Sequence, residues 1–186
     1  MLKQQNKIIF LDRDGTINKD THYLHRIDDF SFLPGAVDAL AMFQTAGFKL
    51  IIITNQSGIA RGLYTESEYI LLNKWMIEEL NKHGIEITAS YYCPHHPDAV
   101  VEKYRIKCDC RKPKIGLFKK AMTSCDIDEA NSWVIGDNMR DLAICAASSV
   151  RGILLYSEQN EHRNNIWKVK GGLKDAAEKV INGYFK

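Results

Sequence analysis

Two aspartates near the start of the chain are spaced so that both carboxylates could act on one point. Asp12 and Asp14 directly follow the apolar run Ile8–Leu11, which has the form of a short buried strand. Two like charges this close need a neutralising cation, and hard carboxylate oxygens suit Mg²⁺. Asp137 ends another apolar run, and Asp141 lies one helical turn beyond it. A single aspartate after a strand is usually a turn or cap residue, but the joint pattern indicates a divalent-cation site.

Groups that could hold a phosphate occur at two further places. Thr54 and Asn55 follow the apolar run 48–53, and a hydroxyl and backbone amides at that point could bind phosphate oxygens. Lys112 could neutralise the charge that develops on a phosphoryl group during its transfer. Taken separately, a helix cap at Thr54 and a solvated lysine are equally ordinary interpretations. Together with the carboxylates, these residues point to phosphoryl transfer.

A cluster of cysteines and histidines suggests a second metal site of a different kind. Three of the five cysteines lie between positions 93 and 110. A cytosolic chain keeps its thiols reduced, so local clustering favours metal binding over disulfides. Two i, i+2 pairs, Cys93 with His95 and Cys108 with Cys110, supply three thiolates and one imidazole. That ligand set is typical of a closed, structural Zn²⁺ site, which here would stiffen the loop that leads into Lys112.

Alternatives remain open within this cluster. His96 lies next to His95 and is the rival imidazole ligand. The i, i+2 spacing is tighter than the C-x₂-C of zinc fingers, so buried cysteines without a metal are the competing interpretation. Cys125 and Cys145 fall in apolar helical patterns and are expected in the core.

The elements that must position these residues follow from the apolar periodicity. Short apolar runs predict strands over 8–11, 48–53, 85–92, 133–135 and 152–156, and helical spacing predicts helices over 36–46, 66–82, 115–125, 142–147 and 175–185. Strands that alternate with helices form a mostly parallel sheet with helices on both faces, a Rossmann-like α/β fold. Ligands of such folds bind beyond the carboxyl ends of the strands, where Asp12, Thr54 and Asp137 fall.

Length and composition indicate one domain, residues 1–186, with the zinc loop at about 93–110. Hydrophobic residues make up 45% and charged residues 26%, which excludes disorder as the main state. The apolar runs are far shorter than the roughly 18 residues of a membrane span, and the polar start, 1–7, has no signal-peptide core. The net charge of +2 is too balanced for a nucleic-acid stripe. We therefore expect a cytoplasmic monomer with no membrane or nucleic-acid partner.

Four motifs, in the right order, resemble those of the haloacid dehalogenase superfamily. The stretch 10–16, Phe-Leu-Asp-Arg-Asp-Gly-Thr, resembles the first motif, DxDG[TV], of its phosphatases. The stretch 52–55 resembles the second motif, Lys112 the third, and the stretch 136–141 the fourth. The resemblance covers roughly residues 7–156 and implies a phosphatase.

The resemblance also implies a mechanism. Asp12 would attack phosphorus and form a phosphoaspartate, and Asp14 would act as the general acid and then the general base. Mg²⁺ would lie between the Asp12 carboxylate, the Asp14 backbone carbonyl, Asp137 and the phosphate. Thr54 and Lys112 would bind the transferring phosphoryl oxygens.

The predicted zinc loop narrows the resemblance to two groups of phosphatases within this superfamily. The stretches 93–97, 108–113 and 55–62 closely resemble the D-glycero-D-manno-heptose 1,7-bisphosphate phosphatases, although histidinol-phosphate phosphatases share the same loop. Thr21-His22 and Asn138 depart from the usual His-Gly pair and Lys of the heptose enzymes. The substrate-binding residues that this resemblance implies are Asp20, Tyr23, Thr54, Asn55, Gln56, Ser57, Arg111 and Lys112.

Three functions remain to be separated. The first is a Mg²⁺-dependent phosphatase with a structural Zn²⁺ that removes the C7 phosphate of the heptose bisphosphate, for nucleotide-activated heptose biosynthesis. The second is a histidinol-phosphate phosphatase, and the third is a non-catalytic, zinc-stabilised binding module. A binding module has no need of the acid/base Asp14, which argues against it. Between Asp14 and Thr54 one predicted helix and one strand fill the chain, so no cap domain fits there and the site stays open to a small-molecule sugar phosphate.

Overall fold

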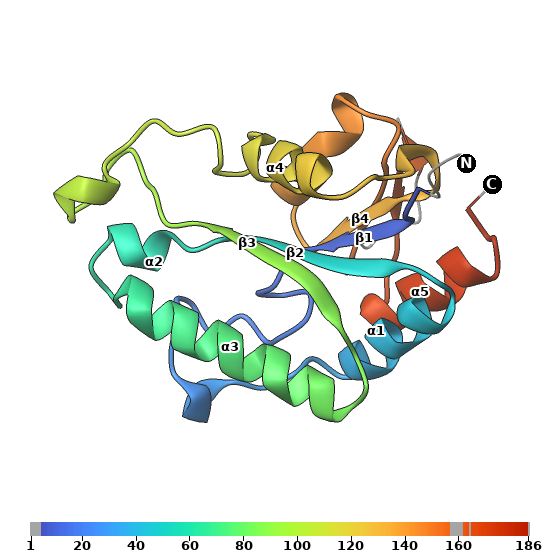
Figure 1. The fold of residues 1–186 in the computed structure, drawn as a ribbon, viewed down its shortest axis with the longest axis horizontal. Coiled ribbons are helices and arrows are strands. Elements are labelled where there is room, and N and C mark those ends of the chain that lie inside the picture. The colour runs from blue at the N-terminus through green and yellow to red at the C-terminus, as the bar shows by residue number, and fades with distance from the viewer. Residues whose placement is uncertain (1–4, 157–161, 164, 186) are drawn as a thin grey trace.

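The computed structural model describes residues 5–156, 162–163 and 165–185, and within them the chain forms one sheet with helices on both faces (Figure 1). The strands are β1 (Ile8–Leu11), β2 (Lys49–Asn55), β3 (Ile87–Cys93), β4 (Trp133–Gly136), β5 (Arg151–Leu154), β6 (His162–Arg163) and β7 (Ile166–Lys168). Their order across the sheet is β3-β2-β1-β4-β5-β7-β6. Neighbours pair in parallel, except that β6 pairs antiparallel with β7 at one edge. This confirms the predicted Rossmann-like α/β fold.

The helices form two layers, one on each face of the sheet (Figure 1). The α-helices are α1 (Ala36–Thr45), α2 (Ser57–Ala60), α3 (Glu66–Lys82), α4 (Gly116–Ser124) and α5 (Leu173–Ile181), and the 3₁₀ segments are η1 (Ile27–Asp29), η2 (Glu102–Tyr104), η3 (Glu129–Asn131) and η4 (Met139–Ala146). Apolar side chains of α1, α5 and the end of α3 cover one face, and those of α4 and η4 cover the other. Between β1 and β2 the chain holds only η1 and α1 as helices, so no cap domain interrupts it there.

The central strand shows why a continuous apolar run forms this sheet. All four side chains of β1 are fully buried. Ile8 and Phe10 point into the core under α4, whereas Ile9 and Leu11 point into the core under α1. Successive side chains of a strand alternate between its two faces, so a strand covered by helices on both faces must be apolar throughout.

The structure differs from the sequence expectations mainly at the ends of elements. The helix predicted over 142–147 is the 3₁₀ segment η4, which begins earlier because Asn138 and Asp141 form a capping box. The terminal helix ends at Ile181 rather than 185, since Gly183 has a positive φ of 67° and Phe185 turns back into the core. The short elements α2, β6 and β7 were not predicted.

The sheet brings three strand ends to one place. Leu11 of β1 lies in register with Ile52 of β2 and with Ile135 of β4. The backbone N–H of Asp12 donates to the Ile135 carbonyl at 3.0 Å, which ties the first residue beyond β1 to β4. The carboxyl ends of β1, β2 and β4 therefore form one edge of the sheet. In the part of the chain that the structure describes, no helix is long and apolar enough to cross a membrane.

Candidate active site

A pocket of about 340 Å³ lies beyond the carboxyl ends of β1, β2 and β4. Its lining includes the residues proposed for catalysis, magnesium and substrate, except Asp141: Asp12, Asp14, Asp20, Tyr23, Thr54, Asn55, Gln56, Ser57, Arg111, Lys112 and Asp137. These residues come from segments more than a hundred positions apart, and the parallel sheet brings them together. Five further residues that line the pocket were not proposed as site residues from the sequence: His22, Gly58, Arg61, Tyr64 and Arg140.

Three carboxylates lie together at the acidic part of the site, those of Asp12 and Asp141 buried and that of Asp137 exposed. Ligand oxygens of Asp12, Asp137 and Asp141 all lie within 4.8 Å of one another. Burial raises the pKa of Asp12 to about 7; Lys112 opposes that rise and Asp141 adds to it. Burial and Asp141 also raise the pKa of Asp137. Crowded carboxylates that resist ionisation are a suitable site for a hard divalent cation, so this donor set fits Mg²⁺.

The turn after β1 needs a glycine to leave room for these carboxylates. Gly15 has a φ of 79°, in the left-handed region that disfavours side chains. A Cβ atom on Gly15 would lie 2.2 Å from Oδ2 of Asp137. The glycine of the first motif therefore has a steric role in bringing the β1 and β4 ends together.

Lys112 is buried within the acidic cluster. Its Nζ lies 2.8 Å from Asp12 Oδ1, 2.7 Å from Asp141 Oδ1 and 2.7 Å from the Ile53 carbonyl oxygen. Burial disfavours its charge, but the two carboxylates outweigh burial and raise its pKa. Asn55 fixes the backbone of Lys112 through a reciprocal pair of hydrogen bonds, of 3.1 and 3.0 Å. Lys112 is thus a charged, rigidly held ammonium group at the place where a phosphoryl group would meet Asp12.

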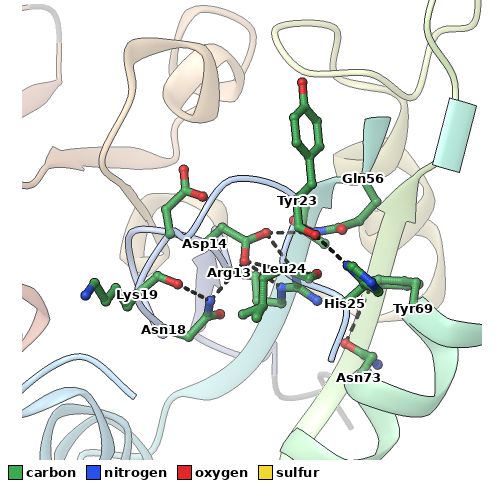
Figure 2. Close-up of polar contacts among 12 residues, drawn as sticks. Arg13, Asp14, Asn18, Lys19, Tyr23, Leu24, His25, Gln56, Tyr69 and Asn73 are labelled. Atoms are coloured by element: carbon green, nitrogen blue, oxygen red, sulfur yellow. Dashed lines mark hydrogen bonds and ion pairs between the residues drawn. The ribbon is translucent and has the colours of Figure 1, made fainter. Parts of the chain in front are cut away.

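The Asp14 side chain has hydrogen-bond partners different from those of this cluster (Figure 2). Its Oδ1 accepts hydrogen bonds from Arg13 and Asn18, and its Oδ2 accepts from Arg13 and Gln56. Arg13 is fully buried, and its guanidinium carbon lies 5.4 Å from the centre of the Tyr69 ring. The two aspartates of the first motif therefore occupy different surroundings, as a nucleophile and an acid/base would require.

The segment carrying two of the proposed sugar contacts has an unusual backbone. His22 and Tyr23 have φ values of 57° and 63°, which residues with side chains seldom adopt. The Asp20 carboxylate accepts a hydrogen bond of 2.9 Å from the His22 backbone N–H and so supports this turn. Tyr23 is 42% exposed and lines the pocket, so its ring is available to a ligand.

The Cys/His cluster has the geometry of a tetrahedral metal site. Ligand atoms of Cys93, His95, Cys108 and Cys110 all lie within 4.8 Å of one another. Sγ of Cys93 lies 3.6 Å from Sγ of Cys108 and 3.1 Å from Sγ of Cys110, and an ideal Zn–S tetrahedron has edges of about 3.8 Å. Burial raises the pKa of the Cys93 thiol, which favours protonated thiols until a cation displaces the protons. The residues present fit Zn²⁺.

His96, the rival imidazole, lies outside this cluster. Its Nδ1 accepts a 3.1 Å hydrogen bond from the Asp98 backbone, and its Nε2 lies 3.2 Å from Nη2 of Arg61. His96 therefore connects the cysteine loop to the rim of the pocket, and His95 supplies the fourth ligand atom of the cluster.

Three arginines give the pocket a basic side. Arg61 and Arg140 line it together with Arg111. Burial, with the charges of Arg140 and Arg61, lowers the pKa of Arg111, which places the three positive charges near one another. Among the described residues, Nη1 of Arg111 is buried without a hydrogen-bond partner and Arg61 forms no ion pair with a carboxylate. Arg61 and Arg140 lie inside two of the quoted motifs, but nothing in their spacing indicates that they face the pocket.

Comparisons with known proteins agree with this geometry. The family model described as polynucleotide kinase 3 phosphatase matches residues 7–164. A D-glycero-β-D-manno-heptose-1,7-bisphosphate 7-phosphatase of Escherichia coli is 48% identical over 142 residues, 76% of this chain and 75% of that protein. The enzyme of that name from Photorhabdus laumondii is 44% identical over 142 residues, 76% of each chain.

A solved structure extends the likeness to the fold. The D,D-heptose 1,7-bisphosphate phosphatase of B. bronchiseptica, complexed with magnesium and phosphate, superposes with a TM-score of 0.81 at 29% identity. The match covers 95% of this chain and 99% of that one. With a family model that matches most of its length and relatives well above 30% identity, the chain belongs to the haloacid dehalogenase-like phosphatases of the polynucleotide kinase 3 phosphatase family.

Proposed function

We propose that this protein is a Mg²⁺-dependent phosphatase that removes the C7 phosphate of D-glycero-D-manno-heptose 1,7-bisphosphate and leaves the 1-phosphate for nucleotide activation. The names of the relatives favour the β anomer. The observation that carries the proposal is the charge distribution of the pocket. Lys112 pairs with Asp12 and Asp141, whereas three further cations, Arg61, Arg111 and Arg140, line the same pocket. A second phosphate on the substrate would pair with these arginines.

Phosphoryl transfer begins at Asp12. One of its carboxylate oxygens attacks phosphorus, and the bond from phosphorus to the sugar oxygen breaks. Asp14, protonated, gives its proton to the departing oxygen, so the sugar leaves as an alcohol and Asp14 becomes a carboxylate. Thr54 and Lys112 hold the phosphoryl oxygens. Bound Mg²⁺ supplies positive charge that lets an anionic nucleophile approach an anionic substrate.

The second step restores the enzyme. A water molecule attacks the phosphorus of phosphoaspartate, and its proton passes to the Asp14 carboxylate. The bond between phosphorus and Asp12 breaks, which releases hydrogen phosphate and regenerates both side chains. Over the two steps, one phosphate ester and one water give one alcohol and one hydrogen phosphate. The two roles of Asp14 require that its carboxylate be held in one orientation through both steps.

The remaining assignments belong to the same proposal. Residues 1–186 act as a single phosphatase domain and, in solution, as a monomer in the cytoplasm. Zn²⁺ bound by Cys93, His95, Cys108 and Cys110 holds the loop before Arg111. Asp12 and Asp137, with the Asp14 carbonyl, bind Mg²⁺; the position of the Asp141 carboxylate in the cluster adds it as a supporting residue.

A comparison of substrates tests the proposal. Values of kcat/KM are measured by phosphate release for the heptose bisphosphate, each anomer separately, for histidinol phosphate and for p-nitrophenyl phosphate. We expect the bisphosphate to be preferred by a wide margin, because binding energy from its distant phosphate contributes to the transition state. A preference for histidinol phosphate would transfer the assignment to that enzyme, and no turnover of any ester with Mg²⁺ would indicate a binding module.

Arginine variants make the test specific. Arg111→Ala and Arg140→Ala should shrink the preference for the bisphosphate more than they slow p-nitrophenyl phosphate hydrolysis. Lys119→Ala removes the same charge from an exposed position of α4, outside the pocket, and should leave the preference unchanged. Equal effects of all three variants would mean that net charge, rather than a second phosphate site, sets the preference.

A further inference from the structure

The side-chain amide of Gln56 is buried and fully used in hydrogen bonds. Gln56 is 2% exposed. Its Nε2 donates to Asp14 Oδ2 at 2.9 Å and to Thr54 Oγ1 at 3.0 Å. Its Oε1 accepts a 2.6 Å hydrogen bond from the Tyr64 hydroxyl. A glutamine amide has two N–H donors, and both are committed here, one to the proposed acid/base and one to a proposed phosphate ligand.

Tyr64 determines which way round this amide lies. The oxygen and nitrogen of an amide exchange places by a half-turn, and the hydrogen-bond partners decide between the two orientations. The Tyr64 hydroxyl donates to Oε1, and the Asp14 carboxylate can only accept, so both partners favour an NH₂ group that faces Asp14 and Thr54. Burial raises the pKa of Tyr64, which keeps the hydroxyl protonated as a donor.

The ring of Tyr64 is itself held firmly. It stacks on His25 with ring centres 5.1 Å apart and an angle of 8° between the planes. The ring also packs closely against the backbone of Gly58, where a Cβ atom would lie 2.1 Å from it. Rigid packing of this kind transmits an orientation to a neighbouring group.

The two oxygens of Asp14 are not equivalent (Figure 2). Oδ1 accepts from Nε and Nη2 of Arg13 and from Asn18, at 2.9 to 3.1 Å. Oδ2 shares the Arg13 Nη2 donor at 2.9 Å and has Gln56 as its second donor. Oδ1 therefore accepts three hydrogen bonds and Oδ2 two, so Oδ2 is the less crowded oxygen and the one that we assign to carry and release the proton.

We infer that Gln56 and Tyr64 are positioning residues for the acid/base step, acting through Oδ2 of Asp14. The inference rests on the proposed phosphatase function and assigns Gln56 a role other than contact with the sugar. As the proton leaves Oδ2 for the departing oxygen, Oδ2 gains negative charge and the Gln56 N–H bond to it strengthens. The same amide donates to Thr54 Oγ1, so one rigid group fixes the position of the proton donor relative to the phosphate-binding hydroxyl.

Tyr64→Phe tests this inference because it removes one hydroxyl and keeps the ring. The amide of Gln56 then loses the donor that fixes its oxygen and can move away from Asp14. We expect kcat/KM to fall about 10- to 100-fold for an alkyl phosphate, part of the usual contribution of a general acid. The loss for p-nitrophenyl phosphate should be less than about threefold, since a good leaving group departs without a proton. Gln56→Met, which removes both donors at similar size, should show the same pattern.

Tyr104→Phe is the matched control. Tyr104 belongs to the same apolar cluster as Tyr64, and the two residues are 7% and 6% exposed. Its hydroxyl donates a hydrogen bond of 2.7 Å to Glu66. The variant loses a similarly short tyrosine hydrogen bond, but one that does not involve Asp14 or Gln56. Both esters should therefore be hydrolysed at wild-type rates. Melting temperatures of the three variants show whether each still folds.

The leaving-group pattern decides the inference. Equal losses for the alkyl and aryl esters in Tyr64→Phe, or an increase in KM alone, would overturn it, because a merely structural or substrate-binding role gives those results. The alkyl probe is glycerol phosphate, so the test does not depend on heptose. If the heptose bisphosphate is not hydrolysed but the pattern persists with glycerol phosphate, the substrate assignment fails and the inference stands.

Discussion

The carboxylate cluster and the cysteine cluster are both candidate metal sites, and the chain joins them through Arg111 and Lys112, but the fold assembles them differently. The carboxylates come from the ends of β1 and β4 and from η4, segments that only the sheet brings together. The cysteine cluster comes from one stretch of chain, the end of β3 and the loop over residues 93–110 (Figure 1).

The difference extends to what holds each cluster in place. Asp12 is 7% and Asp141 1% exposed, and Lys112 and the paired strands fix them without a metal. Cys108 and Cys110 are only half-buried, and the one regular element within residues 94–115 is η2. The sheet therefore positions the first site, whereas we propose that bound Zn²⁺ positions the second. Substitutions should therefore separate activity from stability.

The largest effect is expected at the nucleophile. Asp12→Asn should reduce turnover by more than about a thousandfold, since an amide is a poor nucleophile, while the sheet still places the residue and the fold persists. Phosphate release and thermal melting measure the two properties. Asp28→Asn, which changes an aspartate whose side chain is 86% exposed, is the control and should match wild type. Near-normal activity of Asp12→Asn would sink the phosphoaspartate mechanism.

The second-largest loss of turnover is expected at Asp14, the proposed acid/base. Asp14→Asn keeps the size of the side chain but cannot donate a proton to the leaving oxygen or accept one from water. We expect kcat to fall roughly 10²- to 10⁴-fold with a smaller effect on KM. Steady-state kinetics measure both values. An increase confined to KM would place Asp14 in substrate binding instead.

At the cysteine site, substitution should reduce stability more than activity. Cys108→Ser should lose bound Zn²⁺ and lower the melting temperature by about 5 °C or more, since structural metal binding contributes folding free energy. Activity should fall less than in Asp12→Asn, because the loop positions Arg111 rather than the nucleophile. Elemental analysis and thermal melting test this.

Cys125→Ser serves as the control for that experiment, since Cys125 is half-buried and outside the cluster. It should keep its zinc. About one tightly held Zn²⁺ per chain is expected in the wild type. Absence of zinc, with all five thiols titratable in the folded protein, would contradict the proposed zinc site.

The smallest effect concerns pH. The pKa of Asp12 in the fold, about 7, lies above its ordinary value of 3.8. Because this acid pKa is raised, the contribution of Asp12 to the stability of the metal-free fold is complete below about pH 4 and is lost as the pH rises through about 7. Mg²⁺ replaces the proton, so it should raise the melting temperature by a few degrees at about pH 8 and by less at about pH 5.5. Asp12→Asn should abolish this difference; an equal gain at both values would argue against Asp12 as a ligand.

Local patterns in the sequence determined much of this protein. The apolar runs predicted β1, β2, β3, β4 and β5, because burial on both faces requires apolar residues without interruption. The helix predicted over 66–82 matches α3, which begins at a capping box formed by Thr65 and Glu68. Asp12, Thr54 and Asp137 were expected at one edge because parallel strands end together. The cysteine cluster was predicted from spacing alone, since its ligands lie within one loop.

The tertiary structure alone decided how distant side chains meet. The sequence indicates neither that Arg61 and Arg140 line the pocket nor that Gln56 lies between Asp14 and Thr54. The orientation of Asp14 toward a buried Arg13, rather than toward Asp12, also depends on packing. Such contacts are fixed by rotamers and by the close fit of neighbours that lie tens of residues away, and no periodic pattern encodes them. Strand ends are a property of each segment, whereas the partner of a side chain is a property of the whole fold.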